Sequence, residues 1–181
     1  MGFVPDDFVV PRSLACSAFR LEPLKPEHNE GDYRAWTSSI AHIRATPGFE
    51  GRSWPQPDMT LAENLGDLQR HASDFAARSG FTYTVRALGS DEIIGCVYIY
   101  PAADGAGGAS GVSGPSGPSG ASGASGVSGP SRASGASGAS GAEVRSWVSA
   151  DRASLDVVLY DAVSEWLRSA WPFTAVRYAP R

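Results

Sequence analysis

Apolar residues recur every three or four positions between residues 155 and 171, and this spacing predicts an amphipathic helix. The apolar positions are Leu155, Val158, Leu159, Ala162, Val163, Trp166, Leu167 and Ala170. Asp156, Asp161, Glu165 and Arg168 fall on the opposite side, and Pro172 ends the pattern. Short apolar segments at 143–148 and 173–178 predict flanking strands. Such a unit brings a strand end and a helix N-terminus together, so we look there for chemistry, although periodicity alone is equally typical of scaffold.

Two further helices are predicted in the first half of the chain, after a strand at Phe19–Leu24. The first begins at Pro26 and Glu27 and ends near residues 46–48. Its apolar face consists of Tyr33, Trp36, Ile40 and Ile43. The second begins at a capping box formed by Thr60 and Glu63 and is expected to end at Gly80. Its apolar residues are Leu61, Leu65, Leu68, Ala72, Phe75 and Ala76.

A β-hairpin follows the second helix. Phe81, Tyr83 and Val85 alternate with threonines, residues 89–91 form a turn, and residues 93–100 make the returning strand. The predicted order is therefore strand, helix, helix, three strands, helix and strand. Residues 1–15 contain Pro5 and Pro11 with little periodicity, and we expect this N-terminal segment to be partly loose.

A low-complexity repeat separates the hairpin from the next strand. Gly-X-Ser triplets run from Gly108 to Gly141, with one break at Arg132. Glycine at every third position is typical of collagen, but the broken frame, the few prolines and the strand-like flanks argue against a triple helix. Gly/Ser-rich chains behave as flexible coil. We therefore expect one domain over residues 16–181, interrupted by a flexible surface loop over residues 104–141.

Composition narrows the class of protein. The hydrophobic content of 42% suits a soluble globular domain, and the net charge of −4 without a basic cluster argues against nucleic acid as a partner. Cys16 and Cys96 are too few and too far apart for a disulfide framework, and the histidines lack metal-ligand spacing. No apolar run approaches a membrane span, and Asp6 and Asp7 are unlike a secretory signal. We expect a cytoplasmic protein with no metal and no membrane association.

The predicted order of elements resembles that of the GNAT acyltransferases, which transfer an acetyl group from acetyl-CoA to an amine. Three segments carry the resemblance: Phe19–Leu24 is similar to the family's first strand, Ile94–Pro101 to its third and Glu143–Val148 to its fourth. The resemblance implies a three-layer α/β (α+β) fold with a mixed, mostly antiparallel sheet and helices on both faces. The family usually continues past its fifth strand with another helix and two strands, so the resemblance implies a short, divergent member truncated at the C-terminus.

In the family, the loop after the fourth strand has the form Arg/Gln-X-X-Gly-X-Gly/Ala, and its backbone N–H groups hold the pyrophosphate of coenzyme A. The matching loop here is Ser149–Leu155, which contains no glycine and carries Asp151. The resemblance implies that acetyl-CoA contacts Trp147, Val148, Ser149, Arg152, Ala153, Ser154 and Leu155. The alternative is an ordinary helix cap, in which Asp151 or Ser149 satisfies the free N–H groups.

Some relatives place a catalytic carboxylate at the start of the fourth strand, and Glu143 matches that position. The resemblance implies that Glu143 is the base that accepts the amine proton. Because side chains alternate along a strand, Arg145 and Trp147 are expected on the same face. The alternative is a solvated strand end beside the loop. The tyrosine general acid that many members draw from a later helix has no counterpart here.

Candidates for binding the acceptor lie between the two predicted helices and on the third strand. The loop at residues 50–54 contributes Glu50, Arg52 and Trp54, and the strand contributes Tyr98. The resemblance implies an acceptor that is a small-molecule amine or a peptide amino terminus. The alternative is that Trp54 anchors the connection before Pro55, that Glu50 and Arg52 are solvated, and that Tyr98 is a packing residue.

Two functions remain open from the sequence. One is an N-acetyltransferase that transfers acetyl directly from acetyl-CoA, and the other is a catalytically inactive GNAT-like module that binds a ligand or a partner. The missing glycines favour the module, while the intact strand and helix around the loop favour the enzyme. A homodimer that completes the sheet is a further expectation, since the final strand would leave an exposed edge.

Overall fold

The computed structural model describes residues 2–102 and 141–181, so most of the Gly-X-Ser repeat lies outside the described residues. The elements follow in the order β1 (Leu14–Ala15), β2 (Phe19–Pro23), η1 (Pro26–His28), α1 (Asn29–Thr37), α2 (Ile40–Ala45), α3 (Leu61–Ala77), β3 (Phe81–Ala87), β4 (Ile93–Pro101), β5 (Gly141–Val148), η2 (Ala150–Leu155), α4 (Asp156–Ala170) and β6 (Ala175–Tyr178). This is the predicted order with the short β1 and η2 added and the first predicted helix divided into η1, α1 and α2.

The described strands form one sheet in the order β1-β2-β3-β4-β5-β6. All neighbours are antiparallel except β5 and β6, which are parallel because α4 carries the chain back across the sheet. β4 pairs with residues 142–148 of β5, but β6 pairs only with residues 141–144, where Val144 lies opposite Tyr178. β6 ends at Tyr178, so the second half of β5 has no partner in β6, and the site described below lies beside the paired half.

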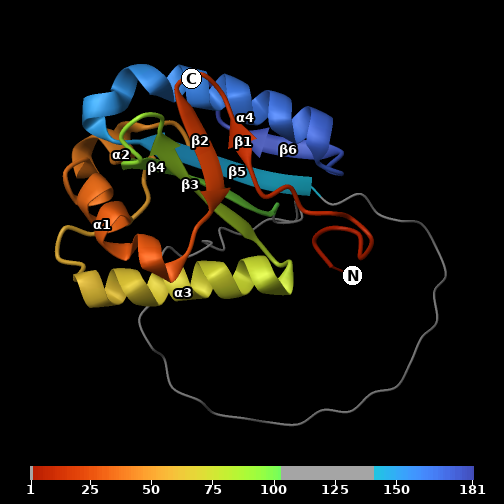
Figure 1. Ribbon diagram of the computed structural model, residues 1–181, viewed down its shortest axis with the longest axis horizontal. Coiled ribbons are helices and arrows are strands. Elements are labelled where there is room, and N and C mark those ends of the chain that lie inside the picture. Colours follow the sequence, from red (N-terminus) through yellow and green to blue (C-terminus); the bar gives the residue numbers. More distant parts are fainter. Residues whose placement is uncertain (1, 103–140) are drawn as a thin grey trace, which may run out of the picture.

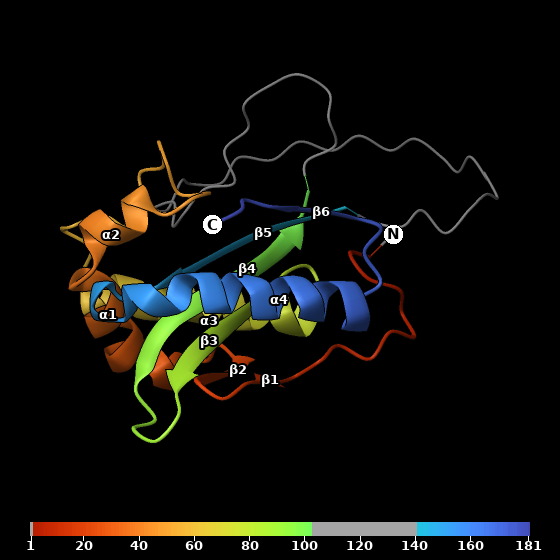
Figure 2. The same cartoon turned by 90° about the horizontal axis from the view of Figure 1, so that it is seen from above.

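The sheet is covered on both faces, as predicted. Figures 1 and 2 show α4 against one face of the strands and α3 on the other. On the α4 side, apolar residues of the helix meet the alternate residues of β2 to β5 in one large core. The helical stripe from Leu159 to Leu167 is buried as the spacing predicted, whereas Val157 and Val158 remain exposed.

The opposite face carries a second core under α1, α2 and α3. Trp36, Ile43, Leu68, Cys96 and Trp147 pack there, together with residues of the α2–α3 connection. This core also contains buried polar side chains. Asp32 and Asn64 hydrogen bond to one another at 3.0 Å inside it.

The helix expected over residues 26–45 is instead η1 followed by two separate helices, α1 and α2. The break comes at Ser39, whose φ of −131° is not helical. Its hydroxyl accepts a hydrogen bond from the backbone N–H of Ala150 at 2.9 Å, and the Ser38 hydroxyl donates to the carbonyl of Ala35. Serine side chains compete in this way with helical backbone bonds. The prediction of one continuous helix was therefore wrong.

The N-terminal segment contacts the domain at several points. Phe3 and Val4 are buried in the α4-side core, and Phe3 stacks on Phe81 and Phe173. Tyr83 donates a hydrogen bond from its hydroxyl to the carbonyl of Pro11 at 2.6 Å. Aromatic side chains therefore attach parts of residues 2–15 to the rest of the domain, while Pro5, Asp6, Asp7 and Val9 are exposed.

Local signals predicted α3 and the hairpin well. Thr60 and Glu63 form the reciprocal capping box, and β3 and β4 pair as predicted. The end of α3 differs, because Arg78 rather than Gly80 adopts the left-handed conformation, with φ of 59°. Within the described part of the chain, no helix has the length and apolar character needed to cross a membrane.

Candidate functional site

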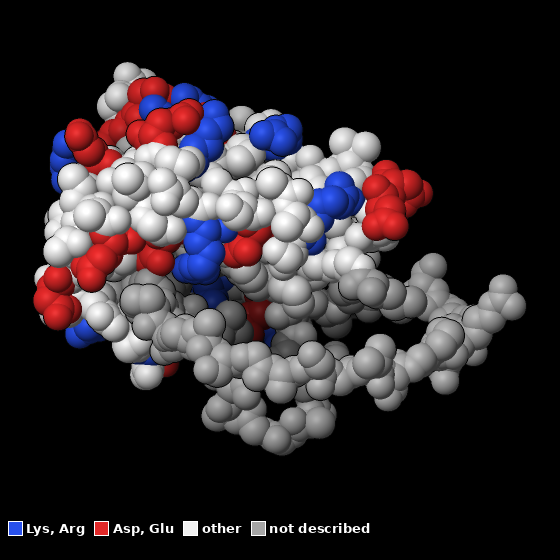
Figure 3. All heavy atoms as spheres, turned by 90° about the horizontal axis from the view of Figure 1, so that it is seen from below, with Lys and Arg blue, Asp and Glu red and all other residues white. Residues whose placement is uncertain are grey.

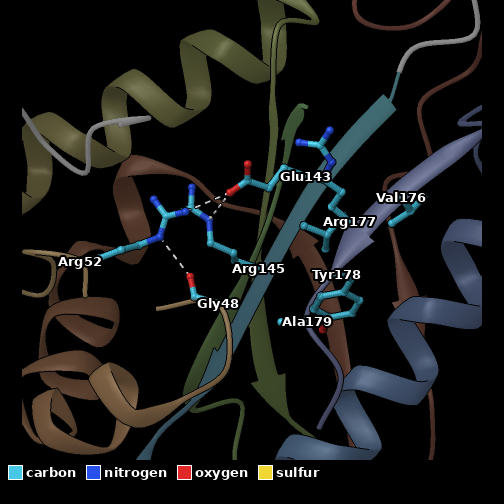
Figure 4. Close-up of a pocket in the computed structure, with 9 residues that line it drawn as sticks. Gly48, Arg52, Glu143, Arg145, Val176, Arg177, Tyr178 and Ala179 are labelled. Atoms are coloured by element: carbon cyan, nitrogen blue, oxygen red, sulfur yellow. Dashed lines mark hydrogen bonds and ion pairs between the residues drawn. The ribbon is translucent and has the colours of Figure 1, made fainter. Parts of the chain in front are cut away.

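A pocket of about 450 Å³ lies beside the paired residues of β5 and β6. It is open to solvent on one side and closed on the other by the loop that follows α2. The lining residues are Gly48, Arg52, Glu143, Val144, Arg145, Val176, Arg177, Tyr178 and Ala179. Figure 4 shows that they come from three places, namely the α2–α3 connection, β5 and β6 with the residue after it.

Charged side chains converge on one wall of this pocket. Glu143 accepts a hydrogen bond on Oε1 from Nη2 of Arg52 at 3.0 Å, and Nε of Arg145 lies 3.6 Å from the same oxygen. Arg52 is held in turn by a 3.0 Å bond from its Nε to the carbonyl of Gly48. Figure 4 shows these side chains pointing toward one another. One carboxylate oxygen of Glu143 therefore interacts with two guanidinium groups.

Burial makes this cluster electrostatically strong. The Arg145 side chain lies largely below the surface, with its guanidinium 5.9 Å from the centre of the Phe49 ring. Burial and, second, the nearby positive charge of Arg52 lower the pKa of Arg145 from its ordinary value. An added negative charge beside Arg145 would therefore be stabilised more than at an exposed arginine.

The gap between β5 and the segment after β6 is bridged by Arg181, whose side chain is 3% exposed. Its Nη2 donates to the carbonyl and hydroxyl of Ser146, and its Nη1 donates to the carbonyl of Pro47. Its Nε lies 2.6 Å from Oδ2 of Asp156. The guanidinium also lies 5.6 Å from the ring centre of Tyr178. In this structure, Arg181 ties together β5, α4 and the loop after α2.

The turn predicted to hold pyrophosphate lies at the far end of β5. Several of its backbone N–H groups are already used. Ser149 donates to Ile94 at 2.7 Å, Ala150 donates to the Ser39 hydroxyl at 2.9 Å, and Arg152 donates to Ser149 at 2.8 Å. The turn is a 3₁₀ helix rather than a glycine loop. It still presents a helix N-terminus to solvent, which favours an anion, but it offers fewer free donors than a glycine loop would.

The other residues assigned to the cofactor divide into two groups. Ala153 and Ser154 are exposed at the turn, while Leu155 is half-buried against the α4-side core. The Arg152 side chain pairs with Glu92 at 3.3 Å. Trp147 and Val148 are fully buried, in the cores on opposite faces of the sheet, so their side chains do not line the turn.

Of the residues predicted to bind the acceptor, the structure places only Arg52 in the pocket. Arg52 meets Glu143 as described. Glu50 instead points to solvent and accepts a 2.7 Å hydrogen bond from the backbone N–H of Gly48. Trp54 and Tyr98 belong to the second core, where their ring centres are 6.2 Å apart and Tyr98 accepts a hydrogen bond from Trp147 at 3.2 Å. Burial raises the pKa of Tyr98 above its usual range.

Sequence reasoning did not identify Arg145, Arg177 or Tyr178 as candidates for the site. Alternation along the strand placed Arg145 on the same face as Glu143, but gave it no role in the site. Arg177 and Tyr178 carry no comparable local signal. They reach the pocket only because β6 pairs in parallel with the first half of β5.

The arginines of the pocket are a local concentration of positive charge. On the face shown in Figure 3, acidic and basic side chains are interspersed rather than gathered into one broad patch. Among the residues described, no group of three or more His, Cys, Asp and Glu side chains is arranged to hold a metal ion.

Comparison with known proteins gave matches in structure alone. No family model matches the sequence, and no curated protein matches it either. The ribosomal-protein-S5-alanine acetyltransferase from Vibrio fischeri superposes with a TM-score of 0.55 at 12% identity, over 87% of this chain and 68% of that one. A GnaT-family acetyltransferase from Bordetella pertussis superposes with a TM-score of 0.48 at 13% identity, over 88% of this chain and 74% of that one. The chain therefore has the fold of the GNAT acetyltransferases.

Proposed function

We propose that this protein is an N-acetyltransferase that moves an acetyl group from acetyl-CoA to an amine, and that it works in the cytoplasm. The observation that carries the proposal is the placement of Glu143, a residue of β5 paired with β6, on the wall of an open pocket within a GNAT fold. The pocket has the volume of a small-molecule site. Fold alone does not determine activity, so the argument rests on what this pocket can do.

The residues of the chain have distinct roles in this proposal. The amine must lose a proton as its nitrogen attacks the acetyl carbonyl, and the thioester C–S bond then breaks to release coenzyme A as a thiolate that takes a proton from solvent. Glu143 supplies the acceptor for that proton, because Oε1 is held by Arg52 and Arg145 while Oε2 has no hydrogen-bond partner among the described residues. Fixing one oxygen also fixes the direction in which the other points. Arg52 and Arg145 are therefore positioning residues for Glu143.

Acetyl-CoA would supply the activated acetyl group, and its phosphates would lie at the Ser149–Leu155 turn. Arg152 supports this assignment. Its pair with Glu92 joins two side chains that are 41% and 49% exposed, and such surface pairs contribute only ~0–1 kcal/mol. Arg152 can therefore turn to a phosphate at little cost. The exposed Ala153 and Ser154 leave room for close approach.

One observation favours the alternative of a binding module without turnover. The N–H of Ala150, at the start of the turn, is already occupied by the buried Ser39. The turn consequently has less capacity for pyrophosphate than a glycine-rich loop. Direct measurement of coenzyme binding separates the two functions.

The first test is calorimetric titration of the full chain with acetyl-CoA and, as a control, with free coenzyme A. A dissociation constant in the micromolar range, about −8 kcal/mol, is expected for the enzyme. The second measurement is amine-dependent release of coenzyme A thiol. Glu143→Gln should lower kcat/KM by about 100-fold or more, because a general base contributes that much.

Glu165→Gln is the matched control, since Glu165 is an exposed carboxylate on α4. It should leave kcat/KM unchanged. Absence of acetyl-CoA binding at millimolar concentration would reject the enzyme and leave the module. Full turnover in Glu143→Gln would remove Glu143 from the reaction.

A further inference from the structure

The charged wall of the pocket holds more positive charge than its own carboxylate can balance. Arg52 and Arg145 both approach Oε1 of Glu143. Two guanidinium groups share one carboxylate, and burial of Arg145 makes the shortage of negative charge costly. A ligand with an anionic group would relieve that cost.

Hydrogen-bond donors remain for such a ligand. Arg52 uses Nε for the carbonyl of Gly48 and Nη2 for Glu143, while Arg145 approaches Glu143 through Nε. Neither Nη atom of Arg145, nor Nη1 of Arg52, has an acceptor among the described residues. A guanidinium group presents such donors in a planar fork that matches a carboxylate or a phosphate.

The opposite wall has a different character. Val176, Tyr178 and Ala179 offer apolar surface from β6 and the residue after it. Figure 4 shows these residues across the pocket from Arg52 and Arg145. A ligand that fits both walls has a short carbon chain as well as its anionic group.

We propose that the acceptor is a small amphiphilic molecule that carries an anionic group, a carboxylate or a phosphate, together with its amine, and that Arg52 and Arg145 bind that group. The assignment to the acceptor rests on the proposed acetyltransferase function, whereas the anion site itself does not. The arrangement excludes polyamines and other purely cationic acceptors, because a second positive charge would face two arginines.

The probe is glutarate, with inorganic phosphate as a second anion and glutaramide as the uncharged analogue. Binding to the full chain is followed by NMR titration or calorimetry. Glutarate should bind, glutaramide should not, and the ratio of glutarate to phosphate affinity identifies which anionic group the site prefers. Arg52→Gln should weaken anion binding by about tenfold or more, as expected for loss of a charge-assisted hydrogen bond.

Arg168→Gln is the matched control, because Arg168 on α4 is 75% exposed and lies outside the pocket. It should bind glutarate as the unsubstituted chain does. Arg52→Lys is a second variant that keeps the charge and loses the fork. Its affinity should fall between that of the unsubstituted chain and that of the Arg52→Gln variant.

Glu143→Gln should change the anion affinity in the direction opposite to Arg52→Gln. Removing the competing carboxylate should strengthen anion binding severalfold, while the acetyl transfer proposed above should fall. Tighter glutarate binding without any acetyl-CoA binding would keep the anion site and reject the acetyltransferase. Equal binding of glutarate and glutaramide, or no effect of Arg52→Gln, would overturn the anion site whatever the activity.

Discussion

The two faces of the sheet are covered by cores of different composition. On the α4 side, side chains such as Leu159, Val163 and Leu167 meet an apolar surface, and stability there comes from area removed from water. On the side of α1, α2 and α3, apolar residues are mixed with polar groups that are buried only because each has a partner.

Asp32 illustrates the second face. Its carboxylate accepts hydrogen bonds from Asn64 at 3.0 Å and from the Cys96 thiol at 3.3 Å, and Asn64 in turn accepts one from Trp36 at 3.0 Å. Burial raises the pKa of Asp32 to about 6. The candidate site opens on this face. The buried polar groups and the pocket therefore share one side of the sheet, while the apolar side acts as a scaffold.

The largest expected effect tests the apolar face. Leu159→Ala should lower the free energy of unfolding by about 4 kcal/mol, because it removes buried methyl groups and leaves a cavity. The measurement is urea unfolding followed by circular dichroism. Val157→Ala on the same helix is the control, since Val157 is 54% exposed and its loss should change stability by less than about 0.5 kcal/mol. Equal effects of the two substitutions would contradict the assignment of the buried stripe.

The next effect is specific to the polar face and depends on pH. The pKa of Asp32 is raised from 3.8 to about 6, so the folded protein retains a proton that the unfolded chain has lost. Protonation of Asp32 therefore adds up to about 3 kcal/mol to the free energy of unfolding. This stabilisation is fully present below about pH 4 and is lost as the pH rises through 6. In the Asp32→Asn variant, this decrease in the free energy of unfolding should be absent when unfolding is measured between pH 4 and 7.

The matched control for this pH effect is Asp151→Asn, at an exposed position of the turn after β5. Its stability should follow the same pH profile as the unsubstituted chain. Parallel profiles for Asp32→Asn and the unsubstituted chain would show that Asp32 does not titrate in this range.

The smallest effect concerns a local signal on the polar side. Thr60→Ala should cost about 1 kcal/mol in unfolding free energy, because the Thr60 hydroxyl accepts the N–H of Glu63 at the start of α3. Thr60→Ser keeps the hydroxyl and should be nearly neutral. The cap belongs to the helix rather than to the pocket, so glutarate binding should be unchanged in both variants.

Much of the fold could be predicted because its signals are local. The stripe of α4, the capping box of α3 and the alternation of the hairpin each depend on residues a few positions apart. The failures have equally specific causes. Ser39 leaves the helix to bond a residue 111 positions away, and Asp156, expected on the solvent side of α4, pairs with Arg181.

The site was predicted in part for the same reason. Glu143 and Arg52 were each identified, but the ion pair between them joins residues 91 positions apart. Trp54 and Tyr98 look like binding residues in the sequence and prove to be packed in the second core. The alternation of side chains along β5 places Arg145 on the same face as Glu143, but no sequence pattern predicts that both face a pocket.

The sequence by itself determined most of the elements, their order and the apolar face that α4 buries, because helical and strand periodicity, caps and prolines act over short distances. Only the tertiary structure decided that β6 pairs with β5 as far as Val144 and that Arg52 and Arg145 meet Glu143 in the pocket. Those contacts depend on strand register and on the parallel return of the chain across the sheet, which no local pattern encodes.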